Sequence, residues 1–230
     1  MSYYVKDVYK NYGNLAVLKG LSAEFEEGKI TCILGGSGSG KTTLFNVMAG
    51  IIKCDGEVKI PSEISYIFQT PRLIPTMSVY ANMEYVLRKT DNKETRKEKI
   101  DKILDMLELT GKAKCLPTEL SGGEAQRVSM GRAFLYSAPL LIMDEPFGAL
   151  DIGLKYRLIE KLCKLLQEDK KTVVFVTHDI DEALLLGDRF SVLKDGIIYD
   201  TFDINLPREN RDIGCEVLND VRKRLLKNLI

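Results

Sequence analysis

The 230-residue sequence predicts an α/β fold with a parallel sheet flanked by helices, a small antiparallel layer at the N-terminus and an inserted helical segment. The main observation is that three apolar runs, at residues 30–34, 140–144 and 172–177, are continuous rather than alternating. Such runs are typical of parallel strands buried on both faces. A helical pattern at residues 155–167 separates the last two runs, as a parallel crossover requires. Residues 70–135 have a mostly helical pattern, which predicts the insertion.

The N-terminal elements follow from short apolar runs and the turns between them. Strands are predicted at residues 3–9, 16–21, 30–34, 57–60 and 64–68, and a helix at residues 42–49. The first two strands alternate in part and are joined by the turn residues 11–14, which favours an antiparallel pair. Gly50 is expected to end the helix.

The second half of the chain returns from helices to strands. Helices are predicted at residues 78–87, 100–107, 155–167 and 212–230, and a hairpin at residues 190–193 and 197–202. The charged stretch at residues 89–102 is interpreted as a solvated loop and helix face. We expect one domain over residues 1–230, with an α/β core at 1–69 and 136–205, a helical subdomain at 70–135 and a helical tail at 206–230.

Composition excludes some classes of function. Lys plus Arg and Asp plus Glu both number 33, so the chain lacks the basic character of a protein that binds nucleic acid. The five cysteines form no Cys-x-x-Cys pair, which favours reduced thiols and a cytoplasmic location. The apolar runs are too short to cross a bilayer. A role at a membrane would therefore require docking onto another chain.

A complete P-loop pattern follows the strand at residues 30–34. It consists of Gly35, Gly36, Ser37, Gly38, Ser39, Gly40, Lys41, Thr42 and Thr43. Its glycines let backbone N–H groups surround phosphate oxygens at a helix N-terminus. Lys41 is expected to reach the β- and γ-phosphates of ATP, and the Thr42 hydroxyl to bind Mg²⁺. The alternative is a glycine-rich turn without a ligand, and the motif alone indicates only a P-loop hydrolase or kinase.

Two acidic residues end the strand at residues 140–144. Asp144 is placed to hold Mg²⁺ beside the P-loop, and Glu145 to polarise an attacking water as a general base. Without a P-loop, two solvated acids at a strand end would be the better interpretation.

A second phosphate-binding helix start is predicted at Ser121, Gly122, Gly123 and Glu124. Ser121 and Glu124 form a capping box, and the two glycines expose backbone N–H groups. Because the P-loop already surrounds one set of phosphates, this second site is most simply explained as serving a neighbouring subunit's nucleotide. An ordinary glycine-containing helix start is the alternative.

Three further residues are weaker candidates. His178, the one histidine of the chain, follows a strand where loops line the ligand crevice of a parallel sheet. It is placed to contact the γ-phosphate or to align Glu145, or it has a purely structural role. Gln69 is a candidate ligand of the phosphate or metal, with a polar loop residue as the alternative. Tyr12 could stack on adenine or belong to the core.

Taken together, these motifs resemble those of ABC ATPases from about residue 3 to residue 199. In chain order they are the A-loop tyrosine Tyr12, the Walker A motif at 35–43, the Q-loop at Gln69, the signature at 120–127, the Walker B motif at 140–146, the D-loop with Asp151 and the H-loop at 177–179. The resemblance implies a head-to-tail dimer with ATP between the P-loop of one subunit and the signature of the other. It also implies that Glu145 is the catalytic base and that His178 senses the γ-phosphate, with Lys41 and Gln69 in the catalytic set and Thr42, Gln69 and Asp144 around Mg²⁺.

Within that family, residues 68–75, 144–151 and 206–211 are similar to those of the nitrate, sulfonate and taurine importers. This implies an ATPase on the inner face of the cell membrane, paired as a homodimer or with a similar ATPase. Membrane permease subunits and an extracytoplasmic solute-binding protein would complete the system. Gly36 departs from the family, which usually has proline there. The alternatives are the ATPase of an exporter or lipoprotein-extraction complex, and a soluble ABC protein that acts on DNA or ribosomes.

Overall fold

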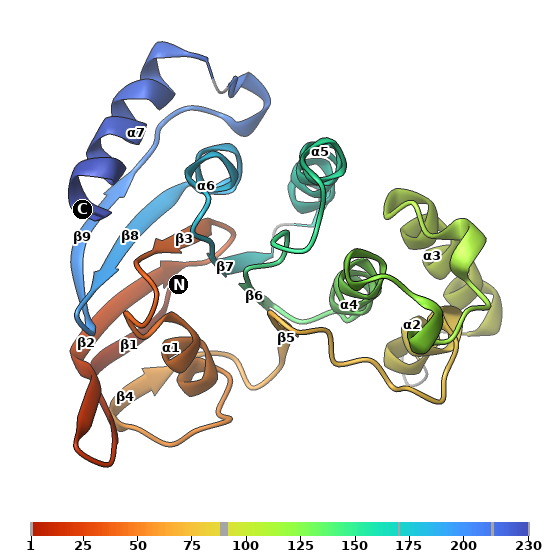
Figure 1. Cartoon of the computed structure of the whole chain (residues 1–230), viewed down its shortest axis with the longest axis horizontal. Helices are drawn as coiled ribbons and strands as arrows, with labels where there is room; N and C mark the ends of the chain where they lie inside the picture. Colours follow the sequence, from red (N-terminus) through yellow and green to blue (C-terminus); the bar gives the residue numbers. More distant parts are fainter. Residues whose placement is uncertain (1, 88–91, 170, 213, 230) are drawn as a thin grey trace.

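The computed structural model describes residues 2–87, 92–169, 171–212 and 214–229. Its strands are β1 (Ser2–Tyr12), β2 (Leu15–Glu26), β3 (Ile30–Leu34), β4 (Asp55–Lys59), β5 (Ile64–Ile67), β6 (Leu140–Asp144), β7 (Thr172–Val176), β8 (Arg189–Lys194) and β9 (Ile197–Asp203). Its α-helices are α1 (Lys41–Met48), α2 (Val79–Leu87), α3 (Lys93–Met106), α4 (Gly122–Leu135), α5 (Ile152–Glu168), α6 (Ile180–Leu186) and α7 (Glu216–Leu229). Figure 1 shows α2, α3 and α4 grouped beyond the β5 edge of the sheet.

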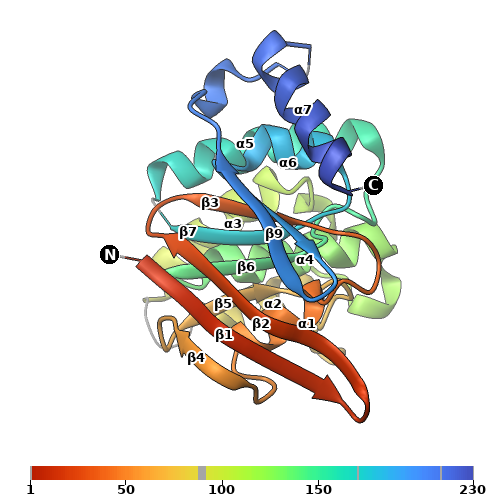
Figure 2. The ribbon, with the colours of Figure 1, turned by 90° about the vertical axis from the view of Figure 1, so that its left-hand side faces the viewer.

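The strands form two sheets. The larger has the order β5-β6-β7-β3-β8-β9, in which β5 to β8 are parallel and β9 returns antiparallel to β8. The smaller is antiparallel, with the order β2-β1-β4. Figure 2 shows this smaller sheet on one side of the larger one, with α5, α6 and α7 on the other side.

Both faces of the central strands are buried, because successive side chains enter different apolar clusters. In β3, Cys32 packs among residues of the helices, whereas Ile33 packs with α1 and the antiparallel sheet. Phe175 and Val176 of β7 divide in the same way. This two-sided burial explains why these strands are continuous apolar runs in the sequence.

Local capping fixes where the functional helices begin. Ser121 Oγ accepts from the Glu124 amide at 3.2 Å, and Glu124 Oε2 accepts from the Ser121 amide at 2.8 Å, which is the predicted capping box of α4. Asp151 caps α5 by accepting from the Leu154 amide at 3.0 Å. Asp179 caps α6 by accepting from the amides of residues 181 and 182.

The predicted fold class is confirmed, with longer N-terminal strands than expected and one further helix, α6. Residues 89–91 of the charged stretch, and residues 213 and 230 of the tail, lie outside the described residues. The division into core, helical subdomain and tail stays a prediction. Among the described helices, none combines the length and apolar character that a membrane crossing needs.

Candidate functional site

The loop between β3 and α1 has the close backbone packing that its glycines allow. A Cβ atom at Gly35 would lie 2.4 Å from the Leu193 carbonyl oxygen, so only glycine fits there. Gly40, directly before α1, has a φ of 106°. Residues with a side chain rarely adopt this backbone conformation. Lys41 Nζ donates to the carbonyl oxygens of Gly35 and Gly36, both at 2.8 Å. The loop thus curls around its own lysine, at the N-terminus of α1.

Thr42 and Asp144 bring two side-chain oxygens together. Thr42 Oγ1 donates to Asp144 Oδ2 at 2.9 Å, and Asp144 is only 3% exposed at the end of β6. Burial raises the pKa of the Asp144 carboxyl, while the hydrogen bond from Thr42 opposes that rise. Burial likewise lowers the pKa of Lys41, against the attraction of Glu145 and Asp144. The cation and the two acids therefore share one partly dehydrated site.

Glu145 lies at the centre of the polar contacts. Its backbone has a φ of 46°, an uncommon value for a residue with a side chain and one often found at functional sites. Gln69 Nε2 donates to Glu145 Oε2 at 3.1 Å, and His178 Nδ1 lies 3.4 Å from Glu145 Oε1. The Glu145 side chain is 21% exposed, so its carboxylate remains open to a small molecule such as water.

A cavity of about 670 Å³ joins these parts, a volume usual for ligand sites. It is lined by Leu15, Val17, Gly35, Gly36, Ser37, Gly38, Gly40, Lys41, Thr42, Thr43, Gln69, Glu145 and His178. The structure thus brings most of the P-loop together with three residues that are distant in the sequence. Tyr12, Ser39, Ser121–Glu124 and Asp151 are not among the lining residues.

Tyr12 ends β1 and is 50% exposed. The ammonium of Lys10 lies 5.5 Å from the centre of its ring. The ring is therefore accessible at the rim of the molecule, where it could stack on a base.

The Ser121 helix start lies elsewhere on the molecule. Ser121 and Gly122 are exposed, and Lys112 pairs with Glu124 at 3.0 Å. A Cβ atom at Gly123 would lie 2.9 Å from the Ala149 carbonyl oxygen, so this turn packs tightly against the segment that precedes Asp151. Among the described residues, the Ser121 turn is not part of the cavity that the P-loop lines.

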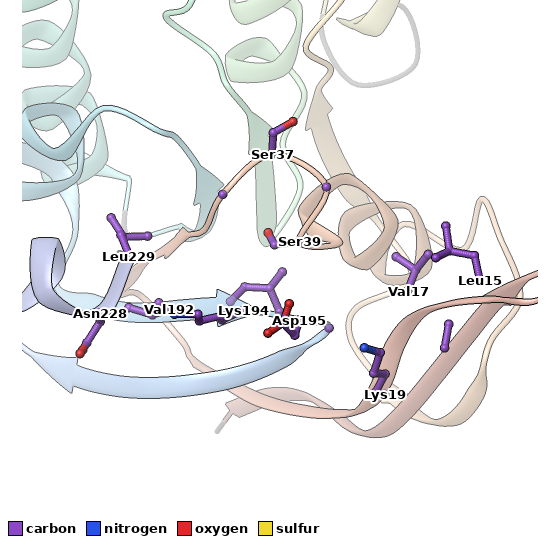
Figure 3. Close-up of a pocket in the computed structure, with 15 residues that line it drawn as sticks. Leu15, Val17, Lys19, Ser37, Ser39, Val192, Lys194, Asp195, Asn228 and Leu229 are labelled. Carbon is purple, nitrogen blue, oxygen red and sulfur yellow. The ribbon is translucent and has the colours of Figure 1, made fainter.

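A second cavity of about 360 Å³ also borders the P-loop and shares Gly36, Ser37 and Gly38 with the first. Figure 3 shows Ser39 on its P-loop wall and Asp195 from the β8–β9 turn, with Asn228 and Leu229 at the end of α7. Ser37 points away from that turn (Figure 3). The tail helix therefore ends beside the P-loop.

Sequence reasoning missed several residues around the site. Leu15 and Val17 of β2 line the cavity, and their apolar character carries no distinctive signal. Gln126 is 1% exposed, and its side-chain amide donates to the Phe68 carbonyl at 3.2 Å, next to Gln69. A lysine of α5, Lys155, pairs with the loop after His178. Its position one turn after Asp151 is the sequence feature that could have drawn attention to it.

A parallel sheet with a P-loop after β3 and an Asp-Glu pair after β6 is the arrangement of a P-loop nucleotide hydrolase. The phosphates of a nucleotide would lie at the N-terminus of α1, with Glu145 facing them.

Comparison with known proteins specifies the family. The family model described as ABC transporter matches residues 18–148. The aliphatic sulfonates import ATP-binding protein SsuB 1 of Paracoccus denitrificans is 36% identical over 228 residues, covering 98% of this chain and 92% of that protein. SsuB 2 of Pseudomonas syringae pv. syringae is 39% identical over 223 residues, covering 96% and 80%.

Comparison with solved structures indicates the same family. The dimeric structure of MJ0796, a bacterial ABC transporter cassette, superposes with a TM-score of 0.80 at 32% identity over 90% of this chain and all of that one. A post-hydrolysis dimer of the same cassette with ADP and Pi gives a TM-score of 0.81 at 33% identity, with the same coverage. The chain belongs to the ABC transporter family, and it is an ATP-binding subunit that hydrolyses ATP.

Proposed function

We propose that this chain powers the import of aliphatic sulfonates through a partner permease. The observation that carries the proposal is the 36–39% identity, over nearly the whole chain, to proteins described as aliphatic sulfonates import ATP-binding proteins. The similarity of residues 68–75, 144–151 and 206–211 to the nitrate, sulfonate and taurine group supports the same assignment.

ATP would bind with its phosphates in the loop at residues 35–43. Lys41, now paired with two loop carbonyls at 2.8 Å, is close enough to turn to the β- and γ-phosphates. Thr42 and Asp144 already meet at 2.9 Å, and Gln69 contacts Glu145, the residue after Asp144, so their oxygens suit a hard cation. When bound there, Mg²⁺ would supply charge neutralisation to the phosphates. Tyr12 would stack on the adenine.

Hydrolysis would depend on Glu145, whose carboxylate is held between Gln69 and His178. As general base it would accept a proton from the water that attacks the γ-phosphorus. His178, 70% exposed at the cavity, would donate to the γ-phosphate and keep Glu145 aligned. Electrostatic stabilisation by Lys41 would complete the set.

Two subunits would form the complete site. The exposed Ser121 turn does not line the cavity of its own chain, and the MJ0796 cassette, 32% identical, is dimeric. The backbone N–H groups after Ser121 would therefore contact the γ-phosphate held by the partner's P-loop, in a homodimer or a pair with a similar ATPase. Asp151 would lie at the same interface, since Ala149 packs on Gly123.

The permease would dock at residues 71–75, beside Gln69. Asn82, fully buried, holds Ile74 through both its backbone N–H at 2.9 Å and its carbonyl at 3.1 Å. The Arg72 guanidinium lies 3.8 Å from the centre of the Phe68 ring. Residues 71–75 would therefore form a rigid connection between Gln69, at the nucleotide site, and the surface that meets the permease. The subunit would then lie on the cytoplasmic face of the membrane, with a solute-binding protein on the opposite face.

The test is reconstitution with the permease that co-purifies with this subunit from detergent-solubilised membranes. With the system's solute-binding protein added on the opposite face, proteoliposomes that contain both should take up radiolabelled ethanesulfonate when MgATP faces this subunit. The Glu145→Gln variant should abolish uptake. Uptake of nitrate without uptake of ethanesulfonate would place the substrate elsewhere in the group, whereas competition by taurine, itself an aliphatic sulfonate, would agree with the proposal. Efflux in place of uptake, or no dependence on this subunit, would contradict the proposal. A Leu73→Ala variant should lower uptake while the isolated subunit keeps its ATPase activity.

A further inference from the structure

His178 is positioned by its neighbours rather than by its own side chain. The imidazole is 70% exposed, and its polar partner among the described residues is Glu145, at 3.4 Å. One long contact of an exposed ring does not fix its orientation. The backbone on either side of the histidine, in contrast, is tied to a buried cluster of charges.

That cluster is centred on Lys155 of α5. Its ammonium binds Asp179, the residue after His178, and also lies 3.0 Å from Glu182 Oε1. Glu182 Oε2 in turn accepts from the hydroxyl of Thr177, the residue before His178, at 2.6 Å. The Asp179 amide donates to the same hydroxyl at 3.0 Å. Both flanks of the histidine are therefore connected to one lysine.

Burial makes this lysine necessary. The Glu182 side chain is 4% exposed and that of Lys155 14% exposed. Burial raises the pKa of Glu182, whereas Asp179 and Glu182 overcome the effect of burial on Lys155 and raise its pKa. Buried ion pairs add little net stability compared with apolar side chains, and their best-supported use is to specify one arrangement. Here the arrangement specified is that of the His178 loop.

The other end of this connection leads to the Ser121 turn. Lys155 lies one helical turn after Asp151, the cap of α5. The segment before Asp151 packs on Gly123 through Ala149. A continuous set of contacts thus joins the helix start that faces a partner's nucleotide to the histidine at the chain's own nucleotide.

We propose that Lys155 is a positioning residue for ATP hydrolysis, which holds the His178 loop in register with α5 and the Ser121 turn. The proposal rests on the proposed role of His178. Lys155 does not line the cavity, so the proposed role requires no contact between Lys155 and ATP. Loss of Lys155 should therefore affect turnover more than ATP binding.

The experiment compares Lys155→Met with Lys161→Met in the full chain. Lys161 also lies on α5 and pairs with an acid, but that acid is Glu108, at 3.3 Å, which is not part of the His178 loop. At saturating MgATP, kcat of Lys155→Met should fall about 10- to 100-fold, as for a slightly misplaced catalytic group. Its Kd for ATP by calorimetry should stay within about threefold of wild type. Lys161→Met should retain kcat, and Lys155→Arg should recover most of it.

A double-mutant cycle separates positioning from general stabilisation. In the His178→Ala background, Lys155→Met should lower the residual rate no further, because the positioned group is gone. Equal kcat for Lys155→Met and Lys161→Met, or losses that multiply with His178→Ala, would overturn the proposal for Lys155. Normal turnover by His178→Ala would instead refute the role of His178 and this proposal with it.

Should Lys155→Met fail to fold, because it leaves Glu182 buried without a cation, Lys155→Met combined with Glu182→Gln removes that charge. This double variant should fold and still show the lowered kcat. A folded double variant with wild-type kcat would overturn the proposal.

Discussion

At the scale of single residues, the clearest prediction concerns the effect of Glu145→Gln on turnover and on ATP binding. Glu145→Gln keeps the shape of the side chain and the P-loop but removes the base, so turnover should fall about 10²- to 10⁴-fold while ATP binding persists. Phosphate release and calorimetric ATP affinity measure the two effects. Glu108→Gln is the control, since Glu108 is another acid with positive φ, at 56°, outside the cavity. Near-normal hydrolysis by Glu145→Gln would remove it from the role of base.

At Gly36 we predict a substitution that stabilises the protein. Its φ is outside the left-handed region, and a Cβ atom there would meet nothing within 4 Å. In the part of the chain that the structure describes, its amide donates no backbone hydrogen bond. Gly36→Pro should therefore raise the free energy of unfolding by about 0.4–1 kcal/mol, mainly by restricting the unfolded chain.

Urea denaturation and ATP affinity test the Gly36→Pro variant. The control is Gly38→Ala. Because Gly38 has a φ of 78°, a side chain at this position should lower the stability of the folded protein. A loss of stability or of ATP binding in Gly36→Pro would mean that the loop needs the flexibility of glycine at this position.

The P-loop and the Asp144 strand end could be predicted from the sequence because their chemistry is local. Gly40, Lys41 and Thr42 act through adjacent backbone and helix-terminus geometry, which a short motif specifies. The contacts of Glu145 with Gln69 and His178 join distant segments. Their positions after parallel strands gave only weak candidates, and the family resemblance gave them definite roles. The ion pair of Lys155 with Glu182 could not be read from the sequence, because the two residues are brought together by the packing of α5 on α6.

At the scale of helices and strands, burial on both faces made β3, β6 and β7 predictable. Helix α6, in contrast, has seven residues, too few to show a helical period. Its start depends on the Asp179 cap, and its end is held by Arg211, which donates to the carbonyls of Leu184 and Gly187. Tertiary contacts of this kind cannot be read from a single sequence.

A prediction at this scale concerns Glu108, which joins the helical region to α5. Its carboxylate accepts from Arg157 Nε and Nη2, both at 3.1 Å, and pairs with Lys161 at 3.3 Å. The hydrogen bonds from Arg157 are the main reason that the pKa of Glu108 falls from 4.5 to about 2. Because the folded-state pKa is lowered, this stabilisation is present above about pH 4.5 and is lost as the pH falls towards 2.

Glu108→Gln should therefore lower the free energy of unfolding at pH 7 by at most about 1 kcal/mol, because the carboxylate is 37% exposed and solvent screens it. The difference from wild type should shrink between pH 4.5 and 2 and in high salt. Glu160→Gln, which removes a more exposed ion pair with Lys164 within α5, should have a smaller effect. A difference that did not change with pH would show that packing, not charge, holds Glu108.

At the scale of the whole molecule, the separation of the two helix starts predicts a site shared between subunits. Lys41 lies in the cavity, whereas the Ser121 turn is exposed outside it. In a mixture of Lys41→Ala and Ser121→Arg subunits, a mixed dimer has one site with both halves intact and one site with both lesions. Each variant alone should be nearly inactive at saturating MgATP, and mixing should restore part of the hydrolysis.

Coupling between the two sites could suppress this rescue even in a correctly formed dimer, so association is measured as well. Glu145→Gln should hold ATP without consuming it, and ATP that lies in the interface stabilises the dimer by mass action. Light scattering should therefore show a monomer without nucleotide and a dimer with MgATP, at the same micromolar concentration. Introducing Ser121→Arg into this variant should abolish the dimer and leave binding by the P-loop, because the arginine blocks only the partner's contact. A protein that stays monomeric with ATP bound, together with no rescue on mixing, would contradict a site shared between subunits.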